Sequence, residues 1–441
     1  MWHGEQVTTS TGLYQRLVRA DRSDQDAGEQ ERIGRNGLLQ VVANALQATG
    51  DQVVNAKTVL PWALTAVGAP AAFLGLLVPV RESGSMLPQA AMSPVIQRAP
   101  RRRHFWLWGA AGQASATAGM ALAVAVLSGW VAGAVVVGLL AVFALSRSLN
   151  SLAGKDVLGR TVPKGERGQI NGLSTTLSGA VAITLGLGIR VLGGGDVSVG
   201  ALAGLLAVAA LAWVLALIVY AGIREPEVAP EALAGDDEEG WVVTSWRLLR
   251  DDAPFRTFVL ARGLLLVSAL SPPFVVALAA EQGGTDLAGL GPFVVAQGLA
   301  SLVGGRIFGR WADRSSQRLM TWAAAGASVT VIAFLGLLQL PPVAETWWLY
   351  PLTFLVLALA HTGVRVARKT YVVDMAGEEK RTSYVAVSNT AISVLLLVVG
   401  ALSSALAVLG SPTALAFLAA LGLVGVLVAR SLPEVSKGSA A

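Results

Sequence analysis

The sequence has 441 residues, with no cysteine, three histidines and few charged residues. The absence of cysteine excludes disulfides, thiolate metal sites and cysteine nucleophiles. The three histidines lie far apart in the sequence, which argues against a His-rich metal cage. Charged residues make up 14% of the chain, whereas soluble domains contain about 25%. We therefore expect no cofactor and no resident metal, and a chain that is not an ordinary soluble domain.

Sequence motifs for catalysis and for nucleotide binding are also missing. The run Gly193–Gly195 follows an apolar segment, without the strand and helix that surround a phosphate-binding loop. We find no pattern of a catalytic triad. We expect a protein that is not an enzyme and binds neither nucleotide nor nucleic acid, so that any work it does must draw on a gradient.

Apolar residues are abundant: they form 54% of the chain, and the mean hydropathy is +0.61. A helix that spans a membrane needs about 20 mostly apolar residues. Twelve such segments run over residues 36–66, 71–97, 104–127, 130–155, 168–192, 197–223, 254–281, 286–311, 319–341, 346–371, 382–408 and 411–431. The sequence thus predicts an all-α membrane protein with twelve transmembrane helices in two pseudo-symmetric six-helix bundles.

The polar segments divide the chain and orient it in the membrane. We expect a cytoplasmic leader over 1–34, bundles over 35–223 and 253–431, a solvated cytoplasmic linker over 224–252, and a cytoplasmic tail over 432–441. The leader has no apolar core of a signal peptide. Lys and Arg gather in alternate connections, which predicts that these face the cytoplasm. The chain should be a multi-pass protein of a bacterial-type inner (plasma) membrane, with both termini cytoplasmic.

The two halves repeat each other at a shift of 214 residues. This shift superposes Lys155 on Lys369, Arg167 on Arg381, Ser174 on Ser388, Thr176 on Thr390, Trp108 on Trp322 and Gly112 on Gly326. Six helices repeated in one orientation predict two bundles related by an axis along the membrane normal.

Twelve helices, a central cytoplasmic loop and this parallel repeat resemble the major facilitator superfamily. The segment 309–318, which reads GRWADRSSQR, is similar to a cytoplasmic loop of that family in which an acid and bases pair between neighbouring helices as a gate. The resemblance assigns this role to Asp313, Arg314 and Arg318. The corresponding loop of the first half, near 95–104, has no Asp, so the gate is not symmetric.

Polar residues form one stripe along the first apolar segment. Gln40, Asn44, Gln47, Asp51, Asn55 and Thr58 recur at spacings of three and four residues, and therefore share one face of a helix. Such a stripe either lines a water-filled path or joins helices; we favour the path because an acid lies at its centre.

Charged residues also occur at membrane depth in the second segment. The repeat places Arg81 and Glu82 in the middle of a helix, and we expect the stretch Arg81–Ser85 to be charged and unwound there. Charges at this depth usually face a cavity or a partner. Asp51 and Glu82 are therefore candidates for proton coupling, and the alternative is a static ion pair with Lys57 or Arg81.

Several further cations are predicted inside the membrane. Arg147 and Arg262 lie within apolar segments, and His361, Arg365 and Arg368 share one helix face. Arg368 and Lys369 are expected to reach the cytoplasmic interface instead. The candidate solute-binding residues are Gln47, Asn55, Lys57, Arg81, Ser85, Arg147, Arg262, His361 and Arg365. Their positive excess favours an anionic or zwitterionic solute, since Arg suits carboxylate and phosphate.

These patterns favour a proton-coupled secondary transporter that moves a small solute by alternating access. Two alternatives stay open: a lipid or amphiphile flippase of the same fold, and a non-transporting membrane assembly factor. The expected partners are the small-molecule solute and the lipid bilayer, and we expect a monomer, because this architecture needs no other subunit.

Overall fold

The computed structural model describes residues 26–435, except 164–169, 171–176, 189–198, 228–240, 284–286, 376–380 and isolated positions within 90–98 and 178–185. Its regular elements in these residues are all helices. The first half contains α2 (Ala27–Val53), α3 (Val59–Ala66), α4 (Ala72–Met86), α6 (Arg103–Val126), α7 (Gly129–Thr161) and α9 (Val199–Ala221). After α10 (Trp241–Asp251), the second half contains α11 (Ala253–Leu264), α12 (Val267–Leu270), α13 (Pro272–Gly283), α14 (Leu287–Arg314), α15 (Ser316–Leu337), α16 (Pro341–Ala344), α17 (Leu349–Met375), α18 (Arg381–Ala407) and α19 (Ser411–Arg430).

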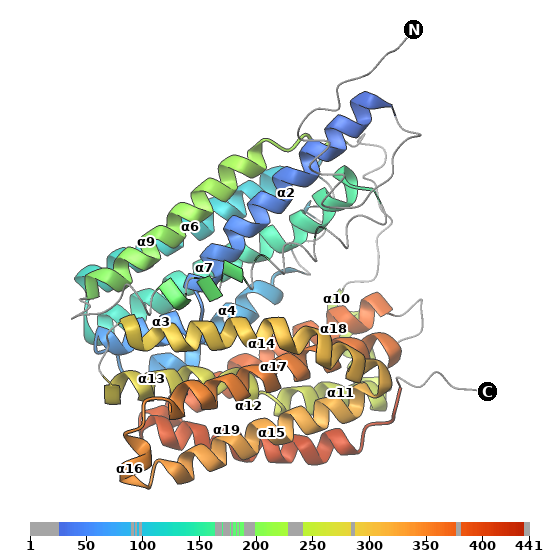
Figure 1. Ribbon diagram of the computed structural model, residues 1–441. Coiled ribbons are helices and arrows are strands. Elements are labelled where there is room, and N and C mark those ends of the chain that lie inside the picture. Colours follow the sequence, from blue (N-terminus) through green and yellow to red (C-terminus); the bar gives the residue numbers. More distant parts are fainter. Residues whose placement is uncertain are drawn as a thin grey trace.

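The helices form two bundles that meet at one end and separate at the other. In Figure 1 the first half lies above the second, and α3 packs against α13 where the bundles meet. The start of α2, the end of α19 and α10 lie at the opposite end, where the bundles diverge. We call this the open end.

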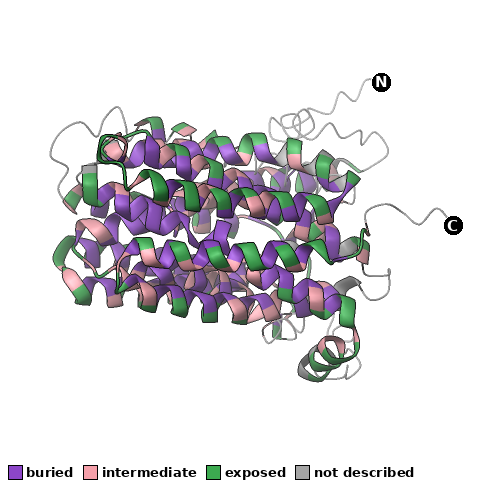
Figure 2. Cartoon of the chain, turned by 90° about the horizontal axis from the view of Figure 1, so that it is seen from below, coloured by how far each residue is buried: buried purple, intermediate pink, exposed green. Residues whose placement is uncertain are grey.

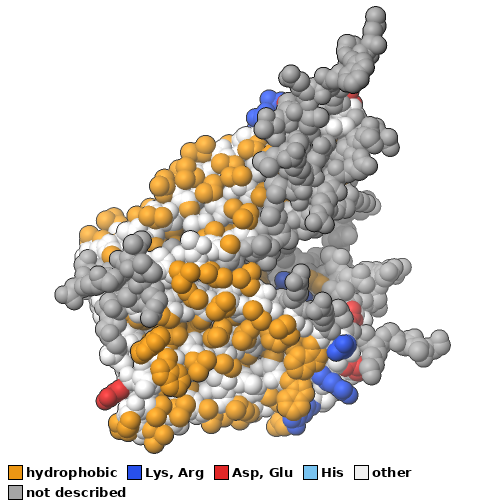
Figure 3. Space-filling view, in the orientation of Figure 1, with side chains coloured by type: hydrophobic (Ala, Val, Ile, Leu, Met, Phe, Trp, Pro, Cys, Tyr) orange, Lys and Arg blue, Asp and Glu red, His pale blue; other side chains and the backbone are white. Residues whose placement is uncertain are grey.

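The outer surface is apolar, as a membrane requires. Eight helical spans in the described residues are long and apolar enough to cross a bilayer. Large apolar side chains such as Trp108, Leu122 and Val126 are more than 60% exposed. Figures 2 and 3 show the exposed residues on the outer helix faces and a broad hydrophobic surface over both bundles. Lipid is the solvent that such a surface fits.

The first helix of each half is broken near its middle, a feature that the apolar runs 36–66 and 254–281 do not reveal. Residues 54–58 separate α2 from α3, and the side-chain oxygen of Asn55 accepts a hydrogen bond of 2.9 Å from the Lys57 backbone N–H. Such a local bond competes with helical pairing. The 214-residue shift places Lys57 on Ser271, where α12 gives way to α13 before Pro272 and Pro273. The single polar stripe therefore continues only to Asp51.

The second apolar segment, in contrast, forms a helix without a break at its charged residues. Residues Arg81–Ser85 lie within continuous α4, so the expected unwinding is wrong. The helix ends at Met86, and Leu87 and Pro88 form a turn, because Pro88 has no backbone N–H with which to continue the helical hydrogen bonds. Arg81 and Glu82 are thus held on a rigid helix.

Small residues bring α4 of the first bundle against α18 of the second. A Cβ atom on Gly75 would lie 2.8 Å from the backbone nitrogen of Ser404, and one on Gly400 would overlap Pro79. The hydroxyl of Ser404 donates to the carbonyl of Ala72 at 2.5 Å. Such close approach is typical of packed membrane helices. This contact joins the bundles from their closed end to membrane depth.

Other predicted segments lie partly or wholly outside the description. The leader is described only from residue 26, and most of the fifth apolar segment, with Ser174 and Thr176, falls in undescribed residues. The linker is not purely irregular: α10 occupies its end, with Val243 and Trp246 exposed. Its apolar and basic residues alternate at helical spacing, a signal that the acidic run 236–239 conceals.

Candidate solute-binding cavity

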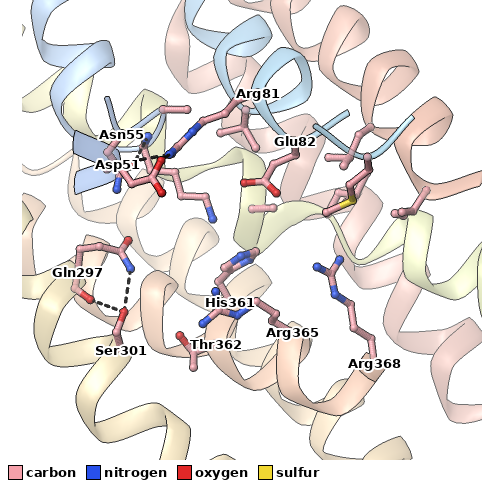
Figure 4. Close-up of a pocket in the computed structure, with 18 of the residues that line it drawn as sticks. Asp51, Asn55, Arg81, Glu82, Gln297, Ser301, His361, Thr362, Arg365 and Arg368 are labelled. Carbon is pink, nitrogen blue, oxygen red and sulfur yellow. Dashed lines mark hydrogen bonds and ion pairs between the residues drawn. The ribbon is translucent and has the colours of Figure 1, made fainter. Parts of the chain in front are cut away.

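A cavity of about 420 Å³ lies between the two bundles. Its wall includes α2, the break after α2, α4 and α7 from the first bundle, and α14, α17 and α18 from the second. Figure 4 shows Asp51, Arg81 and Glu82 on one side and His361, Arg365 and Arg368 on the other. We call these sides the N-wall and the C-wall.

Asp51 is the centre of an ion triad on the N-wall. Its Oδ1 accepts from Arg81 Nη2 at 3.1 Å and also pairs with Arg147 Nη1. Side chains of the three residues keep between 12% and 31% of their exposure. The static pair that the sequence left open therefore exists for Asp51 and Arg81, with Arg147 as an additional partner from α7.

Glu82 lies beside this triad but has no bonded partner. Its carboxylate makes no ion pair within 4 Å and no hydrogen bond to the described residues, and it points into the cavity (Figure 4). Lys57, in the break between α2 and α3, is the cation with the strongest electrostatic interaction with Glu82. The break between α2 and α3 thus places Lys57 and Asn55 on the cavity wall.

The C-wall carries three basic side chains from one face of α17. His361, Arg365 and Arg368 all line the cavity, as their spacing of four and three residues requires. Arg368 was expected at the membrane interface; its side chain lines the cavity between the bundles. Arg365 and Arg368 have no carboxylate within 4 Å in the described part of the chain, in contrast to the arginines of the N-wall.

The cavity has a positive excess. Five cations line it, Lys57, Arg81, Arg147, Arg365 and Arg368, against the two acids Asp51 and Glu82. With His361 neutral the excess is three positive charges. Amide and hydroxyl groups of Asn55, Gln297 and Ser301 also line it, and apolar residues contribute to the rest of the wall. Such a site can bind a small anion with charge-assisted hydrogen bonds.

Three of the predicted binding residues do not line this cavity. Arg262 is buried and donates to Ser388 Oγ at 2.9 Å and to Asn389 Oδ1 at 3.1 Å, so it joins α11 to α18. Ser85 is buried and donates to the carbonyl of Glu82 in its own helix. Gln47 is half-buried on α2, outside the lining. The part of the stripe nearest the open end joins helices, since Gln40 donates to Thr161 Oγ1 at 2.6 Å.

Four polar lining residues were missed: Gln52, Gln297, Ser301 and Thr362. Gln297 and Ser301 lie one turn apart on α14, and the Ser301 hydroxyl donates to the Gln297 carbonyl at 2.9 Å. Their spacing of four inside an apolar run was a usable signal. The 214-residue repeat does not indicate Gln297, because it matches Arg81 and Glu82 with Val295 and Ala296, which are both apolar.

The predicted gate residues lie at the open end of the second bundle. Arg314 ends α14 and Arg318 lies in the first turn of α15, and both side chains are exposed. The side chain of Asp313 lies outside the described residues. Ser315 between them caps α15, accepting from the Arg318 backbone N–H at 3.1 Å. The gate role stays a prediction.

The comparison with known proteins gives the fold. No family model and no curated protein matches the sequence. Among solved structures, a D-xylose–proton symporter covers 92% of this chain and 99% of its own, with a TM-score of 0.68 and 13% identity. The nucleoside transporter NupG matches with a TM-score of 0.69 at 10% identity, covering 90% and 99%. A bacterial homologue of the iron transporter ferroportin, in an inward-facing state, covers 91% and 99%, with a TM-score of 0.62 at 16% identity.

All three of these proteins are named as transporters. At these identities the likeness shows a fold and carries no substrate.

Proposed function

We propose that this chain, a multi-pass membrane protein with the fold of the major facilitator superfamily transporters, is a secondary transporter of a small anionic solute. The observation that carries the proposal is the cationic cavity between the bundles. A cavity lined by unpaired Arg365 and Arg368 at membrane depth is costly to maintain, and a bound anion offsets that cost. A carboxylate or a phosphate has the charge and the acceptor geometry that arginine prefers.

The arrangement of the bundles supports alternating access. The bundles touch along α4 and α18 from the closed end to membrane depth, where the Ser83 hydroxyl donates to the Ser393 carbonyl at 2.8 Å. Beyond that point the bundles separate (Figure 1). The bundles would rock about this contact. At the open end, Arg314 and Arg318 of the second bundle would then close against the first bundle. The cavity would become accessible from the opposite face of the membrane. The positive loops at the open end make it the cytoplasmic end in our proposal.

The two acids take different roles in this proposal. Asp51 holds Arg81 and Arg147 in position, since both guanidinium groups bind one carboxylate oxygen. Glu82 is the proton carrier, because it faces the cavity without a bonded partner. When Glu82 is protonated the cavity gains positive charge and binds an anion more tightly. The proton and the anion would then cross together.

The first test is a thermal unfolding screen of the purified protein in detergent with small carboxylates, phosphate, sulfate, cations and sugars at about pH 5.5 and 8. A ligand of the folded state present at 100 times its Kd adds about 2.7 kcal/mol to the free energy of unfolding. We expect stabilisation by one class of anion, stronger at the lower pH. Stabilisation by cations or sugars alone would contradict the anion proposal.

The second test is anion flux into proteoliposomes under a pH gradient. Glu82→Gln should retain anion exchange but lose acceleration by the gradient, because its side chain no longer exchanges a proton. The control is Glu345→Gln, an exposed acid outside the cavity, which should keep full coupling. Coupling that survives in Glu82→Gln and disappears in Asp51→Asn, with the protein still folded, would transfer the proton role to Asp51.

A further inference from the structure

A second hollow lies apart from the cavity, on the outer surface of the second bundle at its open end. It has a volume of about 820 Å³ and is lined by Trp311, Arg314, Ser315, Gln317, Arg318, Arg430, Leu432 and Glu434. A neighbouring hollow of about 390 Å³ shares Gln317, Arg318 and Arg430, and adds Thr321 and Trp322. Together they form a groove between the α14–α15 connection and the end of α19, which we call the basic groove.

Hydrogen bonds hold together the two segments that form the groove. Ser315 caps α15 and its hydroxyl donates to Glu434, and the Gln317 amide donates to the Ala429 carbonyl at 2.8 Å. These bonds tie the α14–α15 connection to the end of α19 and fix the spacing of the arginines. The N-terminus of α15 opens into the groove as well, and it adds a partial positive charge.

Three exposed arginines line the groove. Arg314, Arg318 and Arg430 are exposed, and none has a carboxylate within 4 Å among the residues that the structure describes. The connections at the same end of the first bundle differ. Arg101 pairs with Glu227 at 2.8 Å, and Arg102 pairs with Asp156 at 2.9 Å. The groove therefore has a positive excess, with three arginines against the single acid Glu434 in its described lining.

The groove also borders the lipid-facing surface. Trp311 is 39% exposed and Trp322 is 59% exposed, on helices whose outer faces carry further exposed apolar residues such as Ile307 and Val329. Figure 3 shows Lys and Arg side chains directly beside the hydrophobic surface at this end of the second bundle. Tryptophan prefers the level of the lipid headgroups. The three arginines thus lie where the phosphates of a bilayer are found.

We propose that the basic groove binds the headgroup of an anionic phospholipid. Arg314, Arg318 and Arg430 would hold the phosphate, and the exposed rings of Trp311 and Trp322 would lie against the glycerol and the upper acyl chains. A basic pocket between helices, beside the lipid, suits a doubly anchored ligand of this kind better than a free anion. The proposal is independent of the solute, because no groove residue lines the central cavity.

The site ties the α14–α15 connection, and with it the predicted gate arginines, to the lipid. A headgroup bound to Arg314 and Arg318 competes with any closure in which these arginines pair with the first bundle. Anionic lipid is therefore expected to favour the conformation that is open at this end.

The test is native mass spectrometry of the intact protein, exchanged from phosphatidylglycerol or phosphatidylcholine in mixed micelles. We expect one phosphatidylglycerol to be retained in preference to phosphatidylcholine. Near a charged surface each arginine contributes about 1 kcal/mol, so Arg430→Gln should weaken this binding about fivefold. Arg430 is outside the predicted gate, so its substitution separates lipid binding from gating.

The matched control is Arg250→Gln. Arg250 is a highly exposed arginine of the same end whose guanidinium lies 4.0 Å from Asp251, and its loss should leave the lipid affinity unchanged. Glycerol phosphate added as a soluble competitor should not displace the lipid at equal concentration, which distinguishes a headgroup site from a free-phosphate site. Equal retention of the two lipids, or equal loss in Arg250→Gln and Arg430→Gln, would overturn the proposal.

Discussion

The two bundles treat their arginines in opposite ways. In the first bundle several arginines are matched with acids: Arg81 and Arg147 share Asp51 in the cavity, and Arg160 pairs with Glu225 at 3.3 Å at the open end. In the second bundle Arg365 and Arg368 face the cavity, and Arg314, Arg318 and Arg430 face the basic groove, without a carboxylate within 4 Å in the described residues. The two halves share a fold and differ in charge compensation.

This difference suggests a division of labour. Paired charges in a partly buried site are expensive to separate, so they hold helices in place. Unpaired cations retain their capacity to bind an external anion. The first bundle would then act as the internally compensated support, and the second as the half that presents charge to a solute and to lipid. Substitutions that remove or add one charge of an ion pair test this distinction.

The largest effect is expected when the acid of the triad is removed. Asp51→Asn removes the negative charge that compensates Arg81 and Arg147, and breaking such an ion pair costs about 3 kcal/mol when it is well buried. We expect a clear fall in the unfolding temperature in detergent. Asp156→Asn, which removes the more exposed partner of Arg102, should cost less than about 1 kcal/mol.

A double variant sharpens the same prediction. Asp51→Asn combined with Arg147→Gln removes one of the two unmatched cations, and it should recover part of the stability that Asp51→Asn loses. Equal unfolding temperatures of the parent and Asp51→Asn would show that the triad is not a support.

A smaller loss of stability is expected at the open end of the first bundle. Glu225 has a side chain with no exposure, accepts from the Arg103 backbone N–H at 2.8 Å and pairs with Arg160. Glu225→Gln should destabilise by about 2 kcal/mol, because it weakens hydrogen bonds to a charged group and leaves one arginine, rather than two, without a counter-charge. Its neighbour Glu227 pairs with Arg101 in an exposed position, and Glu227→Gln should change stability by less than about 0.5 kcal/mol. Similar losses in both variants would show that burial does not set the strength of these pairs.

The opposite outcome is expected on the C-wall. Arg365→Gln removes one of two neighbouring unmatched cations, so the free energy of unfolding should stay constant or rise. Binding of the stabilising anion should weaken about tenfold, because a charge-assisted hydrogen bond contributes about 1.5 kcal/mol. Titration calorimetry and thermal unfolding measure the two quantities on the same samples. A destabilised Arg365→Gln would mean that Arg365 has a structural role like that of Arg147.

The sequence predicted the fold well because its signals are large and additive. Apolar length, the basic connections and the 214-residue repeat lead to two helical bundles, and matches to solved transporters over about nine-tenths of the chain agree. It also placed Asp51, Glu82 and Arg365 in positions that the structure brings to one cavity. A charged residue in a membrane-spanning segment is costly to expose to lipid and therefore usually faces a cavity or a partner, so this placement could be predicted from sequence alone.

What escaped the sequence depends on local geometry and on partners distant in the chain. The break after Asp51 arises from a hydrogen bond within Asn55–Lys57, whereas Arg81–Ser85 stays helical although its composition resembles a loop. Arg262 resembles a cavity residue until Ser388 and Asn389 are seen to satisfy it. Arg368 was assigned to the interface because the depth of α17 in the membrane cannot be derived from its sequence. Gln297 was overlooked because a neutral amide gives a weak signal.

Gln297 also provides the finest test of the comparison, because its substitution can introduce an acid into the part of the cavity lining that the second bundle supplies, where the described lining residues include none. Gln297→Glu places a carboxylate on the cavity wall opposite the N-wall triad, and lowers the positive excess of the cavity. At membrane depth a single added charge several ångströms from the solute should reduce anion affinity by about 1 kcal/mol, or about fivefold. Gln297→Met keeps the volume without the charge and should bind nearly as the parent does. Calorimetric titration of the three proteins separates charge from shape: equal weakening in both variants would mean that the amide contacts the solute directly, and unchanged affinity in Gln297→Glu would mean that the uncompensated charge of the C-wall does not govern binding.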